Sequence, residues 1–443
     1  MKLGINRRIA LSAMAGALGG LLFGYDIGAI SGSIQALRTQ FVLSPAALGI
    51  AVSAAMLGTI VGSFSAGFAA DAIDRRRSLL ASGLLYLLAT LGAALAPDFG
   101  WFASFRFLCG ISIGVISVAA PMYLAEIAPP RLRGGIVGSF QMNIGLGVVL
   151  AFAWSYFLSR HFLPAAAWRY SLACGAVPAL LFEVILLQAA QSPRWLTLKR
   201  RFAEAQSALI ALGATDPDVE QASLVAALNE FGTSQRASLF SRRYARPIFL
   251  AVSIAVFNQL TGVNVLLFYV LDIFTELGSG HLNARKDAIF VAATSLVATM
   301  IAVCVIDKLG RKPLLLTGAA GMGVCLALLP AIRHFGWPSS SVVFVLVCYS
   351  SFFAFSQGTV IWVYLSEIFP LPVRARGQSM GSMVHWIANA LITGSFPVIA
   401  STFGSNVFVT LAVMMVIQFF VVLFFYPETK HIGLEAAASA ISK

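Results

Sequence analysis

Two ionisable side chains lie inside segments that are otherwise strongly apolar. Asp26 lies in the apolar segment 9–33, and Arg106 lies in the apolar segment 101–125. A charge inside a membrane is costly, so such residues are functional candidates by default. An arginine beside a carboxylate keeps the acid ionised, and moving the two apart favours proton uptake. The two residues therefore predict a proton-exchanging group, and the alternative is a static buried ion pair that fixes helix packing.

The depth of both residues follows from the helical rise. Counted from a cytoplasmic start near Ile9, Asp26 lies roughly 25 Å into an apolar core about 30 Å thick. Arg106 lies roughly 8 Å from the outer edge of a segment that starts outside. The two side chains are therefore expected at similar depth.

The composition restricts the classes of protein that can hold these charges. Of 443 residues, 59% are hydrophobic and 11% are charged, against about 45–50% and about 25% in a soluble domain. This excludes a water-soluble enzyme, and the absence of polar low-complexity tracts excludes a disordered chain. The sequence has no phosphate-binding glycine loop, metal cluster or nucleophile with a placed base. We expect a polytopic membrane protein that is not an enzyme and uses no cofactor, metal or nucleic acid.

A hydropathy window of about 19 residues predicts twelve membrane spans. They lie near residues 9–33, 46–70, 78–96, 101–125, 134–158, 167–190, 247–275, 286–306, 313–332, 341–366, 378–402 and 405–426. The predicted fold class is an all-α membrane protein with twelve transmembrane helices in two six-helix bundles. Its predicted parts are an N-terminal bundle (1–190), a cytoplasmic linker (191–246), a C-terminal bundle (247–426) and a cytoplasmic tail (427–443).

The positions of Lys and Arg predict the orientation, because short cytoplasmic loops collect positive charge. If both termini are cytoplasmic, 23 of the 30 Lys and Arg residues lie inside and 6 outside, with Arg106 within a span. The basic start leads into an apolar run without a cleavage site, which predicts a retained first span. We expect a multi-pass protein of the inner cell membrane.

The other polar and reactive residues predict structural roles. In the linker, AEAQSALIAL and DVEQASLVAALNEF carry apolar residues at helical spacing, which predicts short amphipathic helices on the cytoplasmic face. The five cysteines lie in apolar stretches without metal-ligand spacing, so we expect them to be packing residues.

An internal repeat relates the two halves. The loop after the second span reads Asp71-Ala-Ile-Asp74-Arg75-Arg76-Arg77, and the loop after the eighth reads Asp307-Lys308-Leu-Gly310-Arg311-Lys312. After the fourth and tenth spans the chain reads Glu126-Ile-Ala-Pro-Pro-Arg131-Leu-Arg133-Gly134 and Glu367-Ile-Phe-Pro-Leu-Pro-Val-Arg374-Ala-Arg376-Gly377. The offsets, Asp71 to Asp307 and Glu126 to Glu367, are 236 and 241 residues. Such halves predict the parallel repeat of a transporter, with a site between them near the midplane.

Five motifs occur in order along nearly the whole chain. They are Gly19-Gly20-Leu-Leu-Phe23-Gly24-Tyr25-Asp26, Pro121-Met-Tyr-Leu-Ala-Glu126-Ile-Ala-Pro129, Ser192-Pro193-Arg194-Trp195, Gln259-Leu-Thr-Gly262-Val-Asn264 and Pro427-Glu428-Thr429-Lys430. Together they resemble the sugar porter family of the major facilitator superfamily, close to bacterial sugar/proton symporters of the xylose, galactose and glucose type. The resemblance implies that Asp26 and Arg106 are the proton-coupling pair.

The same resemblance implies a sugar site, in which amides bind sugar hydroxyls and aromatic rings face the C–H surface. Its residues are Phe23, Gln141, Asn258, Gln259, Asn264, Tyr269, Ser295, Gly358, Trp362, His385 and Trp386. Interhelical hydrogen bonding is the alternative role for the amides, and packing for the tryptophans. Asn258, Ser295 and His385 depart from the family pattern, so they affect which sugar is bound more than the class of substrate.

The resemblance also implies a cytoplasmic gate, whose ion pairs hold the outward-facing state and break as the halves rock. Its residues are Asp71, Arg75, Arg76, Arg77, Glu126, Arg131, Arg133, Asp307, Arg311, Lys312, Glu367, Arg374 and Arg376. The acidic residues of this set indicate a gate because Asp and Glu contribute little to the orientation of the chain in the membrane, yet they recur beside the arginines in both halves. Two loops depart from the pattern: Asp74 stands where Gly is usual, and Gln191 precedes Ser192 without the usual Pro-Glu.

The predicted function is import of a hexose or pentose by proton symport through alternating access. The expected partners are the monosaccharide, the proton and the lipid bilayer, and we expect a monomer. One alternative is a passive sugar uniporter. A non-transporting sugar sensor is less favoured, because the stretch after Phe425 is short for a signalling tail.

Overall fold

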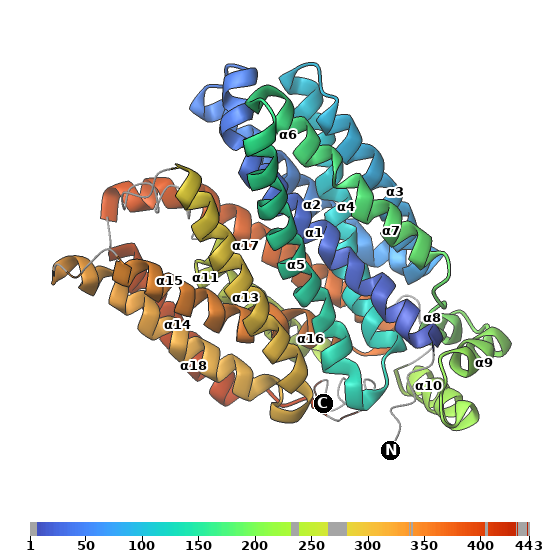
Figure 1. Cartoon of the computed structure of the whole chain (residues 1–443). Helices are drawn as coiled ribbons and strands as arrows, with labels where there is room; N and C mark the ends of the chain where they lie inside the picture. The colour runs from blue at the N-terminus through green and yellow to red at the C-terminus, as the bar shows by residue number, and fades with distance from the viewer. Residues whose placement is uncertain are drawn as a thin grey trace.

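The computed structural model describes residues 7–231, 239–264, 281–335, 337, 340–403, 406–430, 432 and 441. Within these residues every regular element is a helix, and no strand occurs. Figure 1 shows the helices in two bundles that lie side by side, with three short helices at one end. The all-α fold that the hydropathy pattern predicts is confirmed.

The N-terminal bundle holds seven helices. They are α1 (Arg7–Gln40), α2 (Pro45–Ile73), α3 (Arg75–Ala94), α4 (Phe99–Ile127), α5 (Arg133–His161), α6 (Pro164–Ala173) and α7 (Ala176–Leu186), with a 3₁₀ turn η1 (Pro130–Leu132) before α5. The predicted sixth span is interrupted between α6 and α7. Thr90 of α3 donates to the carbonyl of Leu172 at 3.0 Å, so a backbone group at the break keeps a partner, as a membrane requires.

The linker forms three short helices, α8 (Pro193–Leu198), α9 (Phe202–Ala211) and α10 (Pro217–Phe231). The last two coincide with the predicted amphipathic segments. Helix α8 was not predicted, although Ser192 caps it by accepting from the Trp195 N–H at 3.1 Å and Pro193 begins it. We call the end of the bundles beside α8–α10 the linker end.

The C-terminal bundle follows the 3₁₀ turn η2 (Arg242–Tyr244). Its helices are α11 (Ala245–Leu260), α13 (His281–Leu309), α14 (Arg311–His334), α15 (Ser340–Phe353), the π-helical turn η3 (Ala354–Gly358), α16 (Thr359–Glu367), the 3₁₀ turn η4 (Leu371–Val373), α17 (Arg374–Phe403) and α18 (Asn406–Phe425). The predicted tenth span therefore contains a π turn, in which Thr359 donates to the carbonyl of Ala354 at 2.8 Å. Such turns are frequent at functional sites.

Ten described helical stretches are long and apolar enough to cross a membrane. The predicted spans 247–275 and 378–402 are not among them. The first continues past Asn264 into residues outside the described part of the chain. The second lies in α17, which carries the polar residues His385 and Asn389 on the wall of the central cavity.

Glycines allow the close contact between α1 and α5. Gly20, Gly24 and Gly28 recur every four residues along one face of α1. A Cβ at Gly20 or Gly24 would overlap the carbonyl oxygen of Phe140 or Ile144. Because lipid supplies little hydrophobic driving force between helices, close packing through small residues holds such helices together. The contact also fixes the rotation of α1, which carries Asp26.

Candidate functional site

A cavity of about 190 Å³ lies between the two bundles. One water needs about 10–15 Å³ of such a cavity, so it has room for roughly a dozen water-sized groups. Its wall comes from α1, α2, α4 and α5 on one side and from α11, α13, α15, α16 and α17 on the other. Every predicted site residue within the described part of the chain lines this cavity: Phe23, Asp26, Arg106, Gln141, Asn258, Gln259, Asn264, Ser295, Gly358, Trp362, His385 and Trp386.

Gln259 is the centre of a hydrogen-bond network in the cavity. Its Nε2 donates to Oδ1 of Asn258 at 3.2 Å and lies 3.0 Å from Nε2 of His385. Its Oε1 accepts from Nδ2 of Asn264 at 2.7 Å. Nδ1 of His385 also lies 3.2 Å from Nε2 of Gln259, and because an amide nitrogen only donates, the ring nitrogen that pairs with it acts as an acceptor. The network holds three side chains in defined orientations.

A second hydrogen bond joins the bundles across the cavity. Nε1 of Trp362 in α16 donates to Oε1 of Gln141 in α5 at 2.9 Å. Gly358 lies one turn earlier, and a Cβ there would lie 3.4 Å from Nε2 of Gln141, an ordinary van der Waals contact. The indole thereby orients the Gln141 amide and leaves its Nε2 as a donor for a ligand.

Aromatic rings form one wall of the cavity. The ring centroids of Phe23 and Trp386 lie 5.3 Å apart, and those of Trp362 and His385 lie 5.5 Å apart. Nε1 of Trp386 donates to Oγ of Ser117 across the bundles at 3.4 Å. Phe23 comes from α1 and Trp386 from α17, so this wall also spans both halves.

Two predicted sugar-site residues and one residue that was not predicted complete the description of the cavity. Ser295 lines the cavity, but its Oγ donates to the carbonyl of Val291 in its own helix at 2.9 Å. Tyr269 lies outside the described residues. The sequence analysis missed Asn389, which lines the cavity and accepts from Thr393 at 3.0 Å. Its signal is its spacing, since it follows Trp386 by three residues and therefore shares that helix face.

Asp26 and Arg106 form a two-pronged ion pair. Nη1 of Arg106 donates to Oδ1 of Asp26, and Nη2 donates to Oδ2 at 2.9 Å. The side chains are 6% and 2% exposed, so the pair is almost fully removed from solvent. Two parallel charge-assisted bonds are the strongest form of such a contact. Both residues also line the cavity, so the ion pair lies beside any molecule bound there.

The charged cluster of the N-terminal half lies at the linker end. Nε of Arg75 contacts Oε2 of Glu126 at 3.1 Å, and its Nη1 contacts Oδ1 of Asp71 at 3.4 Å. Glu126 also accepts from the hydroxyl of Ser192. Nε1 of Trp195 in α8 donates to the carbonyl of Asp71 at 3.1 Å, which ties the linker to the cluster.

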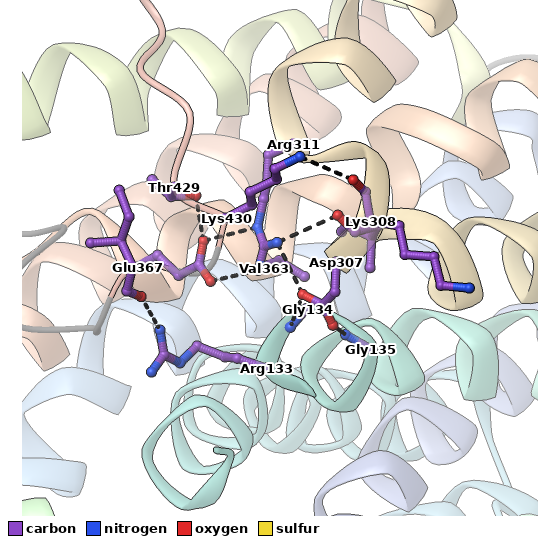
Figure 2. Close-up of polar contacts among 12 residues, drawn as sticks. Arg133, Gly134, Gly135, Asp307, Lys308, Arg311, Val363, Glu367, Thr429 and Lys430 are labelled. Atoms are coloured by element: carbon purple, nitrogen blue, oxygen red, sulfur yellow. Dashed lines mark hydrogen bonds and ion pairs between the residues drawn. The ribbon is translucent and has the colours of Figure 1, made fainter. Parts of the chain in front are cut away.

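The C-terminal half repeats this arrangement (Figure 2). Nη2 of Arg311 contacts Oε1 of Glu367 at 2.8 Å, and its Nη1 contacts Oδ1 of Asp307 at 3.0 Å. Thr429 donates to Oε2 of Glu367 at 2.6 Å. The equivalence that the internal repeat predicts therefore extends to individual contacts.

Two acids reach from one half to the other. Oδ1 and Oδ2 of Asp307 accept from the N–H groups of Gly134 and Gly135, at the start of α5, at 2.9 and 2.8 Å (Figure 2). Asp71 faces Nε of Arg376 at 4.0 Å. Most of the predicted ion pairs thus lie within one half, and the Asp71–Arg376 pair crosses to the other.

Several predicted gate cations bond carbonyls. Arg76 donates to Leu186 at 2.9 Å and Lys312 to Leu423 at 2.7 Å, so each ties a helix start to the end of its own bundle. The other donors are Arg133 to Ile432 at 3.1 Å, Arg374 to Phe369 at 3.1 Å and Arg376 to Pro372 at 3.1 Å. Arg77 and Arg131 are exposed.

Comparisons with known proteins agree with this architecture. The family model described as "Sugar (and other) transporter" matches residues 12–440. The chain is 34% identical over 438 residues to the galactose-proton symporter of Escherichia coli K12, covering 95% of this chain and 91% of that protein. It is also 34% identical over 460 residues to the glucose facilitated diffusion protein of Zymomonas mobilis, covering 98% and 96%.

Solved structures match over nearly the full length. The major facilitator superfamily proton:xylose symporter XylE bound to 6-bromo-6-deoxy-D-glucose has a TM-score of 0.91 at 30% identity, covering 98% of this chain and 99% of that one. The inward open conformation of XylE from E. coli has a TM-score of 0.75, covering 98% and 99%. The family is one of multi-pass membrane transporters and not a class of enzymes. By sequence and by fold, the chain belongs to the sugar transporter family of the major facilitator superfamily.

Proposed function

We propose that the protein imports a hexose or a pentose together with a proton, by alternating access. The observation that carries the proposal is that the buried Asp26–Arg106 pair and the amide network around Gln259 line one cavity. A carboxylate that binds a proton and side chains that bind sugar hydroxyls are then within reach of the same bound molecule. Binding of one substrate can alter the free energy of binding the other.

The cavity chemistry supports a neutral polyol as the substrate. Gln141, Asn258, Gln259 and Asn264 supply amide donors and acceptors, which pair with hydroxyl groups in either direction. Phe23 and the tryptophans supply apolar faces for the C–H surface of a sugar ring. Among the described residues that line the cavity, the charged side chains are Asp26 and Arg106, which balance each other and leave no net charge for an ionic substrate.

The ion pair supports coupling to a proton. While Arg106 holds both oxygens of Asp26, the two opposite charges compensate each other, and a buried carboxylate without its cation would be strongly destabilised. A proton on Asp26 removes that charge and weakens the bond to Arg106. Helices α1 and α4 can then move relative to each other, which links protonation to the rocking of the halves.

The contacts between the halves support an outward-facing or occluded state for this structure. The Asp307 crossing to α5 and the Asp71–Arg376 contact both lie at the linker end. The TM-scores are also higher for the sugar-analogue complex than for the inward open form, 0.91 against 0.75. Opening toward the linker end requires these contacts to break.

The proposal includes the placement of the chain in the cell. With 23 of 30 Lys and Arg residues on that side, the linker end and both termini are cytoplasmic. The protein then acts as a monomer in the inner cell membrane, with residues 1–190 and 247–426 as rocking halves, 191–246 as cytoplasmic linker and 427–443 as cytoplasmic tail.

Uptake by proteoliposomes under an imposed pH gradient tests the proposal. We expect labelled sugar to accumulate above its outside concentration, with alkalinisation of the outside medium, and unlabelled hexoses and pentoses to compete. Sugar exchange without accumulation would instead favour a passive uniporter, as the similarity to the facilitated diffusion protein allows. Saturable transport of an anion or amine would refute the proposal.

A further inference from the structure

The two loops that follow the sixth and twelfth spans are equivalent in their contacts. The hydroxyl of Ser192 bonds Oε2 of Glu126, and the hydroxyl of Thr429 bonds Oε2 of Glu367. Glu126 and Glu367 are themselves equivalent positions of the internal repeat. Position 192 of the first half therefore corresponds to position 429 of the second, and the residues immediately before them also correspond.

In the C-terminal half, the residue at this preceding position is Glu428, which caps a helix. Its Oε1 accepts from the N–H of Arg311 at 3.0 Å, and its Oε2 accepts from the N–H of Lys312 at 3.0 Å. These are the first two residues of α14. The N–H groups at a helix start have no partner within the helix, and a carboxylate there is also favoured by the helix dipole.

In the N-terminal half, the corresponding residue is Gln191, which carries no charge. The first N–H of α3, that of Arg75, instead donates to Oδ1 of Asp74 at 2.7 Å. Asp74 corresponds to Gly310, the residue before α14. A Cβ at Gly310 would lie 2.7 Å from Cδ of Glu428, so one carboxylate fits at this helix start from either position.

The backbone conformation of Asp74 is sterically unfavourable for a residue that has a side chain. Its φ and ψ are 87° and 151°, close to the 101° and 170° of Gly310. This region is almost restricted to glycine and costs of order 1–3 kcal/mol for another residue. Asp74 is also fully buried. A residue that is both strained and buried persists where its side chain makes a contact that glycine would lose.

We propose that Asp74 is the positioning residue of the N-terminal gate, and that its carboxylate supplies the α3 cap that Glu428 supplies to α14. The residue that it positions is Arg75, which contacts Glu126 and Asp71 through its side chain. The inference rests on the proposed function only in assigning this cluster to a gate. That the capping carboxylate comes from position 74 in one half and from position 428 in the other is an observation of the geometry alone.

Moving the capping carboxylate from position 74 to position 191, in the loop after the sixth span, tests the proposal. In Asp74→Gly the first N–H of α3, that of Arg75, loses its side-chain acceptor, so we expect its hydrogen exchange in nanodiscs to speed up roughly 2- to 30-fold, the range for a lost cap. Gln191→Glu in that background restores the arrangement of the other half. We expect the double variant Asp74→Gly, Gln191→Glu to recover slow exchange.

The same variants are measured for transport, with folded protein counted by gel filtration. We expect Asp74→Gly to lower the maximal uptake rate with little change in the KM for sugar, because the cavity is elsewhere, and the double variant to recover the rate. Asp74→Ala keeps the strained backbone and loses the cap, so it is expected to be more impaired than Asp74→Gly.

The second half supplies the matched control. Glu428→Ala removes the cap of α14, and Gly310→Asp in that background places a carboxylate at the position that Asp74 holds. We expect the first change to speed exchange at the start of α14 and the second to reverse it. Double variants that behave like the single ones in both halves would overturn the proposal.

Failure of this proposal is distinguishable from failure of the proposed function. Hydrogen exchange at α3 and α14 does not require transport, so the cap assignment is testable even if the wild type carries no sugar. If the exchange results hold and the uptake rates do not change, Asp74 is a structural cap only and its role in the gate is refuted.

Discussion

At the scale of single residues, the site depends on pairs of side chains that are buried together. Asp26 and Arg106 balance each other's charge, and Gln259 holds His385 and Asn264 in place. A buried polar group that loses its partner costs more than the bond contributes, because the remaining group is left without water. Substitutions in these pairs are therefore informative when they distinguish loss of charge from loss of a hydrogen bond.

Replacing Asp26 tests proton coupling. We expect Asp26→Asn to abolish uphill uptake driven by a pH gradient, because the amide cannot take up a proton, and to leave sugar counterflow. The measurement is accumulation and counterflow in the same proteoliposomes. Asp218→Asn, at an exposed position in α10, is the control and should behave as wild type. Undiminished accumulation by Asp26→Asn would exclude this acid as the coupling group.

Replacing His385 tests the network around Gln259. In His385→Leu, Nε2 of Gln259 loses an acceptor, and an unpaired buried donor costs about 1–3 kcal/mol, or roughly 5- to 150-fold in affinity. His385→Gln keeps an acceptor of similar reach. We expect a large rise in the KM for sugar uptake in the leucine variant and a small one in the glutamine variant. Equal effects would mean that ring packing matters and the hydrogen bond does not.

At the scale of elements, two kinds of irregularity place the site. Glycines bring α1 close to α5, and the π turn η3 precedes α16, which carries Trp362. The loops before α3 and α14 use positive φ to start each helix at its arginine. Each irregularity sets the rotation of a helix, and the rotation decides which side chains face the cavity.

A larger side chain at Gly24 is expected to separate α1 from α5. Its Cβ would overlap the carbonyl of Ile144, and overpacking costs about 1–3 kcal/mol. We expect Gly24→Ala to lower the thermal unfolding temperature in detergent and to reduce uptake. The control is Gly323→Ala in α14, where the nearest atom lies at an ordinary 3.4 Å. Equal unfolding temperatures for the two variants would contradict the close contact.

We expect the free energy of unfolding to depend on pH through Asp74, which lies in the loop between α2 and α3. Burial raises the pKa of Asp74 from 3.8 to about 6, although the charge and N–H of Arg75 act against the rise. The Asp74 carboxyl therefore binds its proton more tightly in the folded protein than in the unfolded chain. The free energy of unfolding that this proton contributes is lost as the pH rises from about 4 to about 6.

Asp74→Asn removes this titration and serves as the reference. Between about pH 4 and pH 7, we expect the unfolding free energy of the wild type to fall relative to the variant by up to about 3 kcal/mol. Unfolding in detergent across this range measures the difference. Parallel pH curves for the two proteins would show that Asp74 titrates normally.

At the scale of the whole molecule, the halves are similar but their contacts across the gate are not. Asp307 accepts two N–H groups at the start of α5, at 2.9 and 2.8 Å, whereas the equivalent Asp71 faces Arg376 at 4.0 Å. The glycines at 134 and 135 correspond to Ala375 and Arg376 in the other half. Asp307 therefore contacts the opposite half more closely than Asp71 does.

Removing the charge of Asp307 is expected to favour opening at the linker end. Hydrogen bonds to a charged group contribute about 1.5–3 kcal/mol, so Asp307→Asn should shift the closed-to-open ratio roughly 10- to 150-fold. Spin labels at Arg131→Cys and Lys308→Cys, both exposed, report the distance between the halves in a background without native cysteines. Asp71→Asn should shift it less, and the reverse order would contradict this reading.

Features that depend on local or periodic patterns could be predicted from the amino-acid sequence. Hydropathy, the charge bias and the repeat require only neighbouring or regularly spaced residues, so the helical fold and the similar depth of Asp26 and Arg106 followed from them. Distances between remote side chains do not follow from such patterns. The folded structure was needed to show that Asp307 crosses to Gly134, that Gln259 contacts His385, and that Asp74 caps α3. Each depends on the rotation and spacing of packed helices, which many weak contacts set together.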